Sequence, residues 1–490
     1  MIVTKYLSRG LLDHPGIIEA MYDIIARNMR EIFDGETEDD ASRAKWYENC
    51  VLGVANNPDW RTVLALDGNE LCGYFQYGRR GTDCIWSELE IAPARQGDGA
   101  TLHALLLAFL EDLDFSGYDT VSGYINDKNI KSQEVFAHIG LARREAVGNG
   151  ARYAGRRVDV ERWARRSILT GQLSASNPDH IALAAKLLQQ GELVAIPTET
   201  VYGLAANALN PEAVAKIFEA KGRPQDNPLI VHILSLEDAV PLVKKNPAQA
   251  HALAEKFWPG PLTIVLEKTD MVPDIVSAGL STVALRSPSH PAARELLRAC
   301  GFPLAAPSAN RSGAPSPTKA QHVLDDLPNI AVLDGGACDV GVESTVITLA
   351  TPTPMLLRPG GISLEDLRSV LGTVGISAAI TQALQADEKA PSPGMKHRHY
   401  APKAELTLVH GALEDVIAYA KEHSADGILC FDDNPEEQAR QLFAKLRELD
   451  AQGLQKVFVH CPKKEGLGLA VYNRLLRASE FREVTLVSKQ

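Results

Sequence analysis

The stretch LVAIPTETVYGL at residues 193–204 decides the fold of the largest part of this chain. Its first four residues form a short continuous apolar run, which is typical of a buried strand. Polar side chains and a glycine follow at once, so the stretch predicts a strand that ends at the rim of a pocket. A plain turn after a core strand is the alternative interpretation of the same residues.

A helix is expected next, because Asn210 and Pro211 are a typical cap and first residue of a helix. Lys221 lies seven residues after Val214 on the apolar stripe of this helix, so we predict that its side chain points toward the interior. A buried lysine needs an anionic partner. The alternative is an ordinary lysine at a helix C-terminus, before Gly222.

More cations and polar groups follow along the central segment. Arg223 comes two residues after Lys221, and Asn227 and His232 are close behind. Arginine binds phosphate in a bidentate manner and lysine binds it as a point charge, so this cluster favours nucleotide chemistry. Arg286 ends a strand-like run, where it could bind an amino-acid carboxylate; a surface arginine is the alternative.

The order of five short motifs is more specific than any one of them. They are residues 197–204, KGRP at 221–224, PSAN at 307–310, ESTV at 343–346 and RPGG at 358–361. In this order and spacing they resemble the YrdC-like family over the whole central segment. The run SPGMKHRHYAP at 392–402 resembles the arm between the core and the C-terminal domain of two-domain threonylcarbamoyl-AMP synthases.

The resemblance implies an L-threonylcarbamoyladenylate synthase. Such an enzyme converts L-threonine, bicarbonate and ATP to threonylcarbamoyl-AMP and pyrophosphate, and a downstream transferase uses the product to modify an adenosine of tRNA. It uses positioning and charge neutralisation rather than a covalent nucleophile. Mg²⁺ would enter with the ATP, so we expect no metal site made of protein ligands.

The same resemblance implies the site residues. Lys221 and Arg223 would serve catalysis. The implied ATP contacts are Lys221, Arg223, Asn227, Thr282, Ser308, Asn310, Ser316, Arg358 and Tyr400. The implied threonine contacts are Thr200, His232, Arg286, the backbone of Ala306, and Ser344.

The N-terminal segment has a second pattern. A strand-like run at 85–91 leads into QGDGAT at 96–101 and an apolar helix, and the spacing N-x-x-S-x-x-x-F-x-x-x-G-L occurs at 129–141. Together these resemble the GNAT acyltransferases, in which the loop binds acyl-CoA. The implied contacts for acetyl-CoA are Gln96, Gly97, Gly99, Thr101 and Asn129. Asp98 and Thr101 depart from the family pattern, and Glu88 and Glu90 are either candidate bases or solvent-facing strand residues.

Composition restricts the class of protein. The 490 residues predict two to four domains, and 45% apolar with 23% charged residues are typical of a globular protein. A net charge of -12 argues against a surface that binds nucleic acid without specificity, so we expect weak or no direct nucleic-acid binding. The seven cysteines lack CxxC spacing and no long apolar run occurs, so we expect a reducing, cytoplasmic compartment and no membrane contact.

We therefore predict an α/β multidomain chain. The expected domains are a GNAT-like α/β domain at 1–167, a YrdC-like twisted open α/β sheet at 175–376, a linker or lid arm at 377–403 and a small Rossmann-like βαβ domain at 404–490. One alternative is a GNAT-type N-acetyltransferase whose YrdC-like half is regulatory. Another is an RNA-binding module, which strong salt-dependent tRNA binding would favour.

Overall fold

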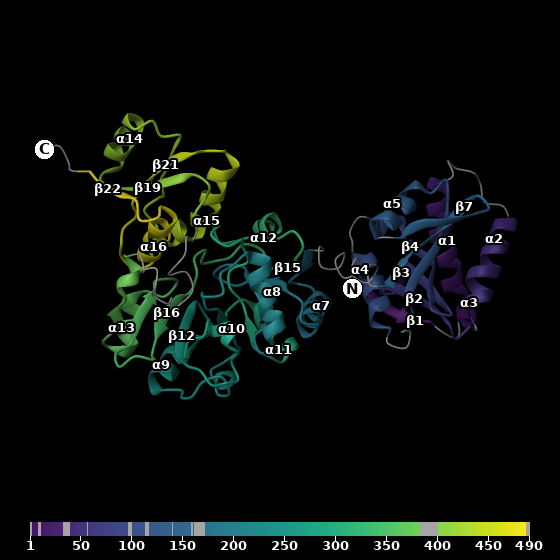
Figure 1. Cartoon of the computed structure of the whole chain (residues 1–490), viewed down its shortest axis with the longest axis horizontal. Helices are drawn as coiled ribbons and strands as arrows, with labels where there is room; N and C mark the ends of the chain where they lie inside the picture. The colour runs from purple at the N-terminus through teal and green to yellow at the C-terminus, as the bar shows by residue number, and fades with distance from the viewer. Residues whose placement is uncertain are drawn as a thin grey trace. The chain divides into compact units, whose positions relative to one another are not determined.

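The computed structural model describes residues 2–7, 11–32, 40–55, 57–96, 100–112, 117–139, 141–157, 160, 172–382 and 400–486. They belong to two compact units, Met1–Gly171 and Gln172–Gln490 (Figure 1). Most of the predicted arm, residues 383–399, lies outside the described residues. Within the described residues, no helix has the length and apolar character needed to cross a membrane.

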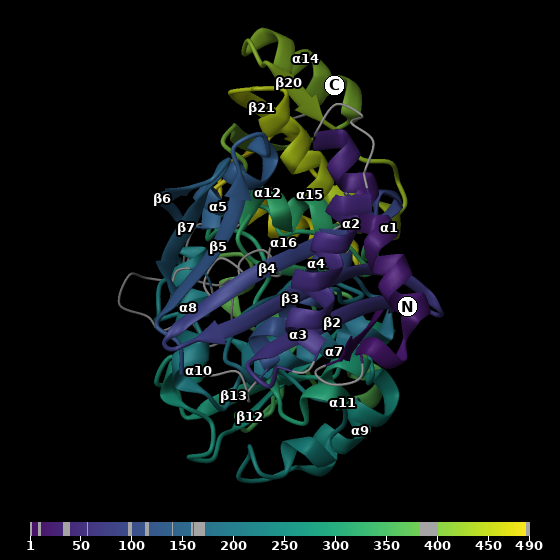
Figure 2. The same cartoon turned by 90° about the vertical axis from the view of Figure 1, so that its right-hand side faces the viewer.

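The N-terminal unit contains one seven-stranded sheet. Neighbouring strands are antiparallel except β4 and β5, which are parallel. Figure 2 shows β2, β3 and β4 side by side in this sheet. In sheet order the strands are β1 (Ile2–Tyr6), β2 (Trp60–Asp67), β3 (Glu70–Arg80), β4 (Asp83–Ile91), β5 (Thr120–Asn126), β7 (Gly150–Arg156) and β6 (Ala142–Val147).

Helices cover both faces of this sheet. On β3, Tyr74 packs in an apolar cluster with Met21 of the first helix, whereas Phe75 lies against Phe109 of α4 with ring centroids 5.6 Å apart. Successive strand residues point to opposite faces, so α1 and α4 cover opposite faces. The helical segments are η1 (Leu11–Asp13), α1 (Pro15–Ile32), α2 (Asp40–Trp46), η2 (Tyr47–Leu52), α3 (Gly53–Ala55), η3 (Pro93–Arg95), α4 (Ala100–Glu111) and α5 (Ile130–Ile139).

The second unit contains an eleven-stranded mixed sheet, so the expected α/β architecture is confirmed. In sheet order its strands are β18 (Gly375–Ile376), β17 (Met355–Arg358), β16 (Thr345–Thr348), β12 (Leu262–Glu267), β13 (Thr282–Arg286), β11 (Ile230–His232), β14 (Leu304–Ala305), β10 (Gly203–Asn207), β9 (Val194–Ile196), β15 (Ala331–Asp334) and β8 (Gln172–Ser174). Its helical segments are α7 (Pro178–Gln189), α8 (Pro211–Lys221), η4 (Glu237–Ala239), α9 (Ala248–Phe257), α10 (Asp274–Ser277), α11 (Pro291–Cys300), α12 (Ala320–Asp326), α13 (Leu364–Leu371) and η5 (Ala378–Ile380).

Helix α8 begins and ends where its sequence signals predict. The Asn210 side chain accepts hydrogen bonds from the backbone of Glu212 and Ala213, which satisfies two N–H groups that the first turn leaves free. Gly222 then adopts φ of 60°, a left-handed conformation that ends a helix at low cost for glycine. These two signals place Lys221 at the last helical position.

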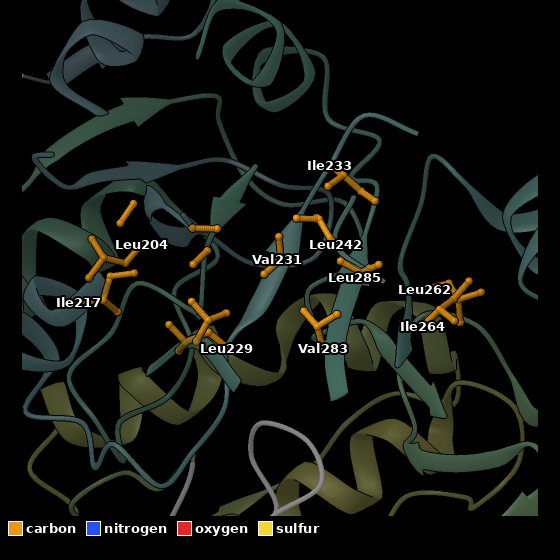
Figure 3. Packing of buried hydrophobic residues seen from close by; sticks show 14 of the residues in the cluster. Leu204, Ile217, Leu229, Val231, Ile233, Leu242, Leu262, Ile264, Val283 and Leu285 are labelled. Atoms are coloured by element: carbon orange, nitrogen blue, oxygen red, sulfur yellow. The ribbon is translucent and has the colours of Figure 1, made fainter. Parts of the chain in front are cut away.

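The central strands separate a core face from a site face. Val231, Ile264 and Leu285 are partners across β11, β13 and β12, and all three are buried in the main apolar cluster (Figure 3). His232 and Arg286 are the next residues of their strands, so they lie on the opposite face. The alternation of a strand therefore gives the sheet one apolar face and one face with polar strand ends.

The C-terminal lobe, residues 400–486, contains the small parallel sheet that its strand-like runs predict. Its buried Phe443 packs in one cluster with Val342 and Tyr400, so the lobe and the larger sheet share apolar contacts within this unit. The strands are β20 (Gly427–Leu429), β21 (Lys456–His460), β19 (Glu405–His410) and β22 (Glu483–Thr485), and the helices are α14 (Leu413–Glu422), α15 (Pro435–Ala451) and α16 (Gly468–Ala478).

Gly360 allows two strand ends to pack directly against each other. A Cβ at this position would lie 2.3 Å from both the Glu343 oxygen and the Thr345 nitrogen of the backbone. We expect Gly360→Ala to lower the free energy of unfolding of this unit by about 1–3 kcal/mol or more, because backbone atoms must move apart. Urea denaturation checks this value.

Gly375→Ala is the matched control. Its Cβ would meet only ordinary contacts, the nearest at 3.7 Å, so we expect a change within about 0.5 kcal/mol. Equal stability of the two variants would contradict the packing argument.

Candidate active site

One cavity collects most of the predicted site residues at the ends of β11 and β13. Its volume is about 50 Å³. The predicted residues that line it are Thr200, Arg223, His232, Arg286, Ala306, Ser308, Ser344, Arg358 and Tyr400. The remaining lining residues are Val201, Ile230, Pro307 and Glu343. Segments separated by up to about 200 positions in the sequence therefore form one site.

Lys221 lies behind the cavity and holds its loop. It is 4% exposed, and its Nζ donates to the backbone oxygens of Ser308, at 2.5 Å, and of Asn310. Burial lowers the pKa of Lys221 well below its usual value. The predicted inward orientation is confirmed, but its partners among the described residues are carbonyl oxygens rather than a carboxylate.

Two arginines add positive charge to the cavity wall. Arg223 is buried, and its Nη2 donates to the backbone oxygen of Pro228 at 3.0 Å. Burial lowers the pKa of Arg223 to about 10, and the neighbouring Arg358 acts in the same direction. Arg358 donates from Nε and Nη2 to the Ser344 backbone oxygen at 3.1 and 3.0 Å. Both guanidinium groups are positively charged and line the cavity, so this side of it attracts anions.

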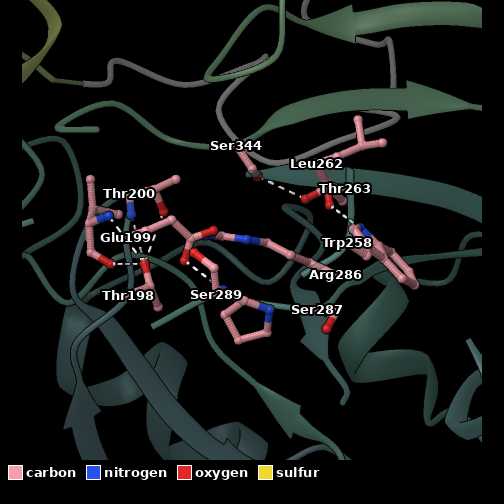
Figure 4. A network of polar contacts seen from close by, with 12 residues as sticks. Thr198, Glu199, Thr200, Trp258, Leu262, Thr263, Arg286, Ser287, Ser289 and Ser344 are labelled. Atoms are coloured by element: carbon pink, nitrogen blue, oxygen red, sulfur yellow. Dashed lines mark hydrogen bonds and ion pairs between the residues drawn. The ribbon is translucent and has the colours of Figure 1, made fainter. Parts of the chain in front are cut away.

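A buried ion pair holds Arg286. Its Nη2 lies 2.7 Å from Glu199 Oε1, and Glu199 Oε2 accepts a hydrogen bond from the Ser289 backbone at 3.1 Å (Figure 4). Burial alone would raise the pKa of Glu199, but Arg286 and these hydrogen bonds lower it overall. The Nε atom of Arg286 has no hydrogen-bond partner among the described residues, so it can still bind a ligand.

His232 is neutral beside this pair. Burial, followed by the charge of Arg286, lowers its pKa to about 3. Its Nδ1 atom is buried and has no hydrogen-bond partner in the part of the chain that the structure describes. A neutral ring nitrogen of this kind can accept a hydroxyl or amine hydrogen.

Glu343 forms the second buried ion pair of the site. Its Oε2 lies 2.7 Å from Nε of Arg474, and its Oε1 accepts a hydrogen bond from Ser316 Oγ at 2.5 Å. Sequence reasoning assigned no role to Glu199 or Glu343, although both lie inside recognised motifs. A carboxylate inside a motif rich in cations and hydroxyls was the signal that could have identified them.

Four further predicted contacts lie outside the cavity lining. Asn310 accepts a hydrogen bond from Ser308 Oγ at 2.5 Å, and Ser316 is held by Glu343. The Asn227 backbone oxygen accepts a hydrogen bond from Arg223 at 3.3 Å. Thr282 begins β13, four residues or about 13 Å from Arg286, so its contact with ATP stays a prediction.

The predicted acyl-CoA contacts are only partly described. Gly97 and Gly99 lie outside the described residues. Gln96 donates to Asn28 Oδ1 at 3.0 Å, and Thr101 is fully buried in α4. Asn129 Oδ1 accepts a hydrogen bond from the Ser132 backbone at 3.0 Å, which makes Asn129 a cap of α5.

Within the described ranges, no group of three or more His, Cys, Asp or Glu residues is placed to hold a metal ion.

Comparison with known proteins identifies the second unit. A family model described as telomere recombination (Sua5, YciO and YrdC) matches residues 186–360, and the model of the threonylcarbamoyl-AMP synthase C-terminal domain matches residues 362–480. The threonylcarbamoyl-AMP synthase of Pyrococcus abyssi is 47% identical over 323 residues, covering 62% of this chain and 94% of the relative. The chain belongs to the threonylcarbamoyl-AMP synthase family. The expected resemblance to the two-domain synthases is thus confirmed.

Two further matches to synthases agree with this assignment. The Bacillus subtilis synthase is 42% identical over 340 residues, covering 64% of this chain and 97% of the relative. The crystal structure of P. abyssi Sua5 complexed with L-threonine is 45% identical, with a TM-score of 0.61, and covers 64% of this chain and 97% of that chain. Both family models lie within the second unit of the chain.

The neutral His232 predicts a pH dependence of stability. Its folded-state pKa is about 3, whereas an unfolded histidine titrates near its usual value of about 6.5. Between these values the unfolded chain binds more protons, so this histidine lowers stability as the pH falls. We expect His232→Asn to reduce the slope of unfolding free energy against pH by about 1.2 kcal/mol per unit between pH 5 and 6.

Hydrogen exchange of β12 and β13 under native conditions reports the stability of this unit alone. At pH 7.5–8.5, where histidine is neutral in both states, the stability difference between wild type and variant should be constant. If the plots of unfolding free energy against pH for the wild type and His232→Asn are parallel from pH 5 upward, His232 does not titrate as described.

Proposed function

We propose that this chain condenses L-threonine, bicarbonate and ATP to threonylcarbamoyl-AMP and pyrophosphate. The observation that supports this most strongly is the charge of the cavity. Lys221, Arg223, Arg286 and Arg358 lie in or behind its wall, and its two described carboxylates, Glu199 and Glu343, are already paired. A ligand that carries phosphates and carboxylates balances this positive charge.

Threonine is assigned to the side of the cavity with Arg286. The guanidinium Nε is available for the amino-acid carboxylate, and the neutral His232 can accept a hydrogen from the amine or the hydroxyl. Thr200, the backbone of Ala306, and Ser344 complete the proposed set, and all line the same cavity. The L-threonine complex of P. abyssi Sua5 supports the assignment.

ATP is assigned to the side with Arg223 and Arg358. Lys221 orders the loop that presents Ser308 and Asn310, Tyr400 lines the cavity, and Ser316 is bonded to the lining residue Glu343. Asn227 and Thr282 stay in the proposed set through the family resemblance. Magnesium would enter with ATP and keep phosphate and water ligands, because arginines occupy the two nearest carboxylates.

The reaction needs fixed positions rather than a nucleophilic side chain. Threonine amine and bicarbonate form a carbamate with loss of water, and a carbamate oxygen attacks the α-phosphate as pyrophosphate leaves. The bond formed is oxygen to phosphorus, and the bond broken joins the α- and β-phosphates. Arg223 and Arg358 are placed to neutralise charge on the phosphates, which is how phosphoryl transfer is mainly accelerated.

The predicted arm is proposed as a lid. Sites for small molecules usually enclose about 300–1,000 Å³, far more than the cavity described here, so its wall must move when ATP binds. Tyr400, the first described residue after 383–399, is part of that wall. The product then passes to a tRNA-modifying transferase. A net charge of -12 agrees with weak or no nucleic-acid binding by this chain.

Lys221→Ala and Arg223→Ala test the assignment. We expect each to lower threonine-dependent pyrophosphate release by about 100-fold or more, because each removes a buried cation close to the phosphates. Mass spectrometry should detect much less threonylcarbamoyl-AMP with either site variant than with the wild type or the control. Lys216→Ala is the matched control, since Lys216 lies on the same helix and contacts Gly191 and Glu192 instead. Near-normal release by both site variants would remove the basis of their role.

A second function is proposed for the N-terminal unit, an acyl-CoA-dependent N-acyltransferase of GNAT type. The parallel strands β4 and β5 pair only from Asp83 to Trp86, although β4 continues to Ile91. The strands therefore part before β4 ends, and α4 begins beyond the loop that follows β4. Such an opening beside a helix N-terminus suits a pyrophosphate.

Glu88 and Glu90 lie on the part of β4 that pairs with β3 but not with β5. Burial raises the pKa of Glu88 to about 8 and that of Glu90 to about 7, with Glu90 adding to the shift of Glu88. A carboxylate that titrates near neutral pH can accept a proton from an amine acceptor. Asn28 donates to Glu90 Oε2 at 2.5 Å and holds it in place.

Glu88→Gln tests this second function in the full-length chain. We expect acetyl-CoA-dependent acylation of a primary amine to fall about 100-fold or more, while threonylcarbamoyl-AMP synthesis is unchanged. The wild-type rate should rise with pH through about 8, because the base must lose its proton. Glu70→Gln, exposed on β3, is the control. Absence of acetyl-CoA binding by calorimetry would instead favour a non-catalytic N-terminal unit.

A further inference from the structure

Helix α16 of the C-terminal lobe places an arginine, Arg474, against Glu343 of the cavity wall. Arg474 is fully buried. Taking a guanidinium out of water is costly unless its donors are satisfied and its charge is paired. The partners that compensate Arg474 therefore indicate what this residue orders.

The partners of Arg474 are two motifs of the active site. Its Nε donates to Glu343 Oε2 at 2.7 Å, and its Nη1 donates to the Pro359 backbone oxygen at 2.9 Å. Glu343 precedes Ser344 of the threonine side, and Pro359 follows Arg358 of the ATP side. One side chain of the lobe thus fixes both strand ends relative to each other.

The same helix also holds the chain on both sides of residues 383–399. Asn473 Nδ2 donates to the Ile380 backbone oxygen at 2.7 Å, and Arg477 Nη2 donates to that of Ala379 at 2.6 Å. The Arg474 guanidinium lies 5.4 Å from the ring centroid of Tyr400, within the range of a cation–π contact. Helix α16 therefore contacts the chain at residues 379–380 and again at Tyr400.

Glu343 would oppose the proposed reaction if it were unpaired. Its carboxylate lines a cavity that has to accept the phosphates of ATP. Burial alone would raise the pKa of Glu343, but Arg474 and then Arg358 lower it, so it is ionised at neutral pH. Like charges at short range in a buried site repel strongly. Arg474 removes this repulsion from the lobe side and leaves Glu343 Oε1 to hold Ser316.

We propose that Arg474 is a positioning residue for the adenylation step, which compensates Glu343 so that Ser316 and Arg358 are ordered for ATP. This inference rests on the proposed synthase function. It makes the C-terminal lobe part of the active site rather than a separate appendage. The effect should appear mainly in the KM for ATP, since the compensated charge lies among the ATP contacts.

The test compares five variants of the full-length chain. Arg474→Met removes the charge, Arg474→Lys keeps the charge but not the fork of donors, and Glu343→Gln removes the opposing charge. The double variant R474M/E343Q removes both. Arg447→Met is the control, because Arg447 forms a partly buried ion pair of the lobe with Asp326 at 2.7 Å, and neither residue lines the cavity.

Steady-state pyrophosphate release and thermal unfolding are measured for each variant. We expect Arg474→Met to raise the KM for ATP about tenfold or more, with a smaller change in the KM for threonine. Its KM for ATP should also move back toward the wild-type value at acid pH, because Glu343 regains a higher pKa without Arg474 and loses its negative charge on protonation. The double variant should recover most of the ATP affinity, since no unpaired charge remains.

Two results would overturn the inference. One is an unchanged KM for ATP in Arg474→Met with a stability loss equal to that of Arg447→Met, which would show a structural role alone. The other is no recovery of ATP affinity in the double variant. Absence of threonine-dependent pyrophosphate release by the wild type would contradict the proposed function itself, so the two failures are distinguishable.

Discussion

The second unit of this protein depends on the compensation of buried positive charge. Three arginines and a lysine lie in or behind one cavity wall, and each is held by carbonyl oxygens or by a carboxylate that is itself bound. Burial of this many cations would be unfavourable without such contacts. The positive charge of these side chains supports the proposed binding of phosphates and carboxylates.

The sheet makes this arrangement possible at low cost. Alternation along β11 and β13 puts Val231 and Leu285 into the apolar core and leaves His232 and Arg286 at the strand ends of the other face. The apolar face stabilises the strands, so the polar ends can be held away from water. Gly360 then allows the ends of β16 and β17 to approach without side-chain interference.

Two carboxyl groups of the N-terminal unit have pKa shifts opposite in direction to those of the second unit. Glu88 and Glu90 have neither arginine nor lysine among the causes of their pKa shifts, so burial raises their pKa instead of a cation lowering it. Glu199 and Glu343 show the opposite outcome, because arginines overcome the effect of burial. The same residue type thus has a raised pKa in one unit and is ionised in ion pairs in the other.

The sequence by itself determined the features that depend on neighbouring residues. The ends of α8 follow from Asn210 and Gly222, the strands of the C-terminal lobe follow from short apolar runs, and the order of the motifs was enough to predict the synthase family. The inward direction of Lys221 followed from helical periodicity. Signals of this kind act over a few residues, so they can be recognised without a fold.

Only the tertiary structure decided which charges meet. Lys221 contacts carbonyl groups 87 and 89 positions away, and Glu343 pairs with an arginine 131 positions away in the C-terminal lobe. No local pattern marks Arg474, because its spacing on α16 is that of any amphipathic helix. For Thr282 the sequence predicted the strand, but it did not predict that this residue lies at the start of β13, outside the cavity lining. Pairing of buried charges depends on long-range packing, and this is why the sequence predicted the site's members better than their partners.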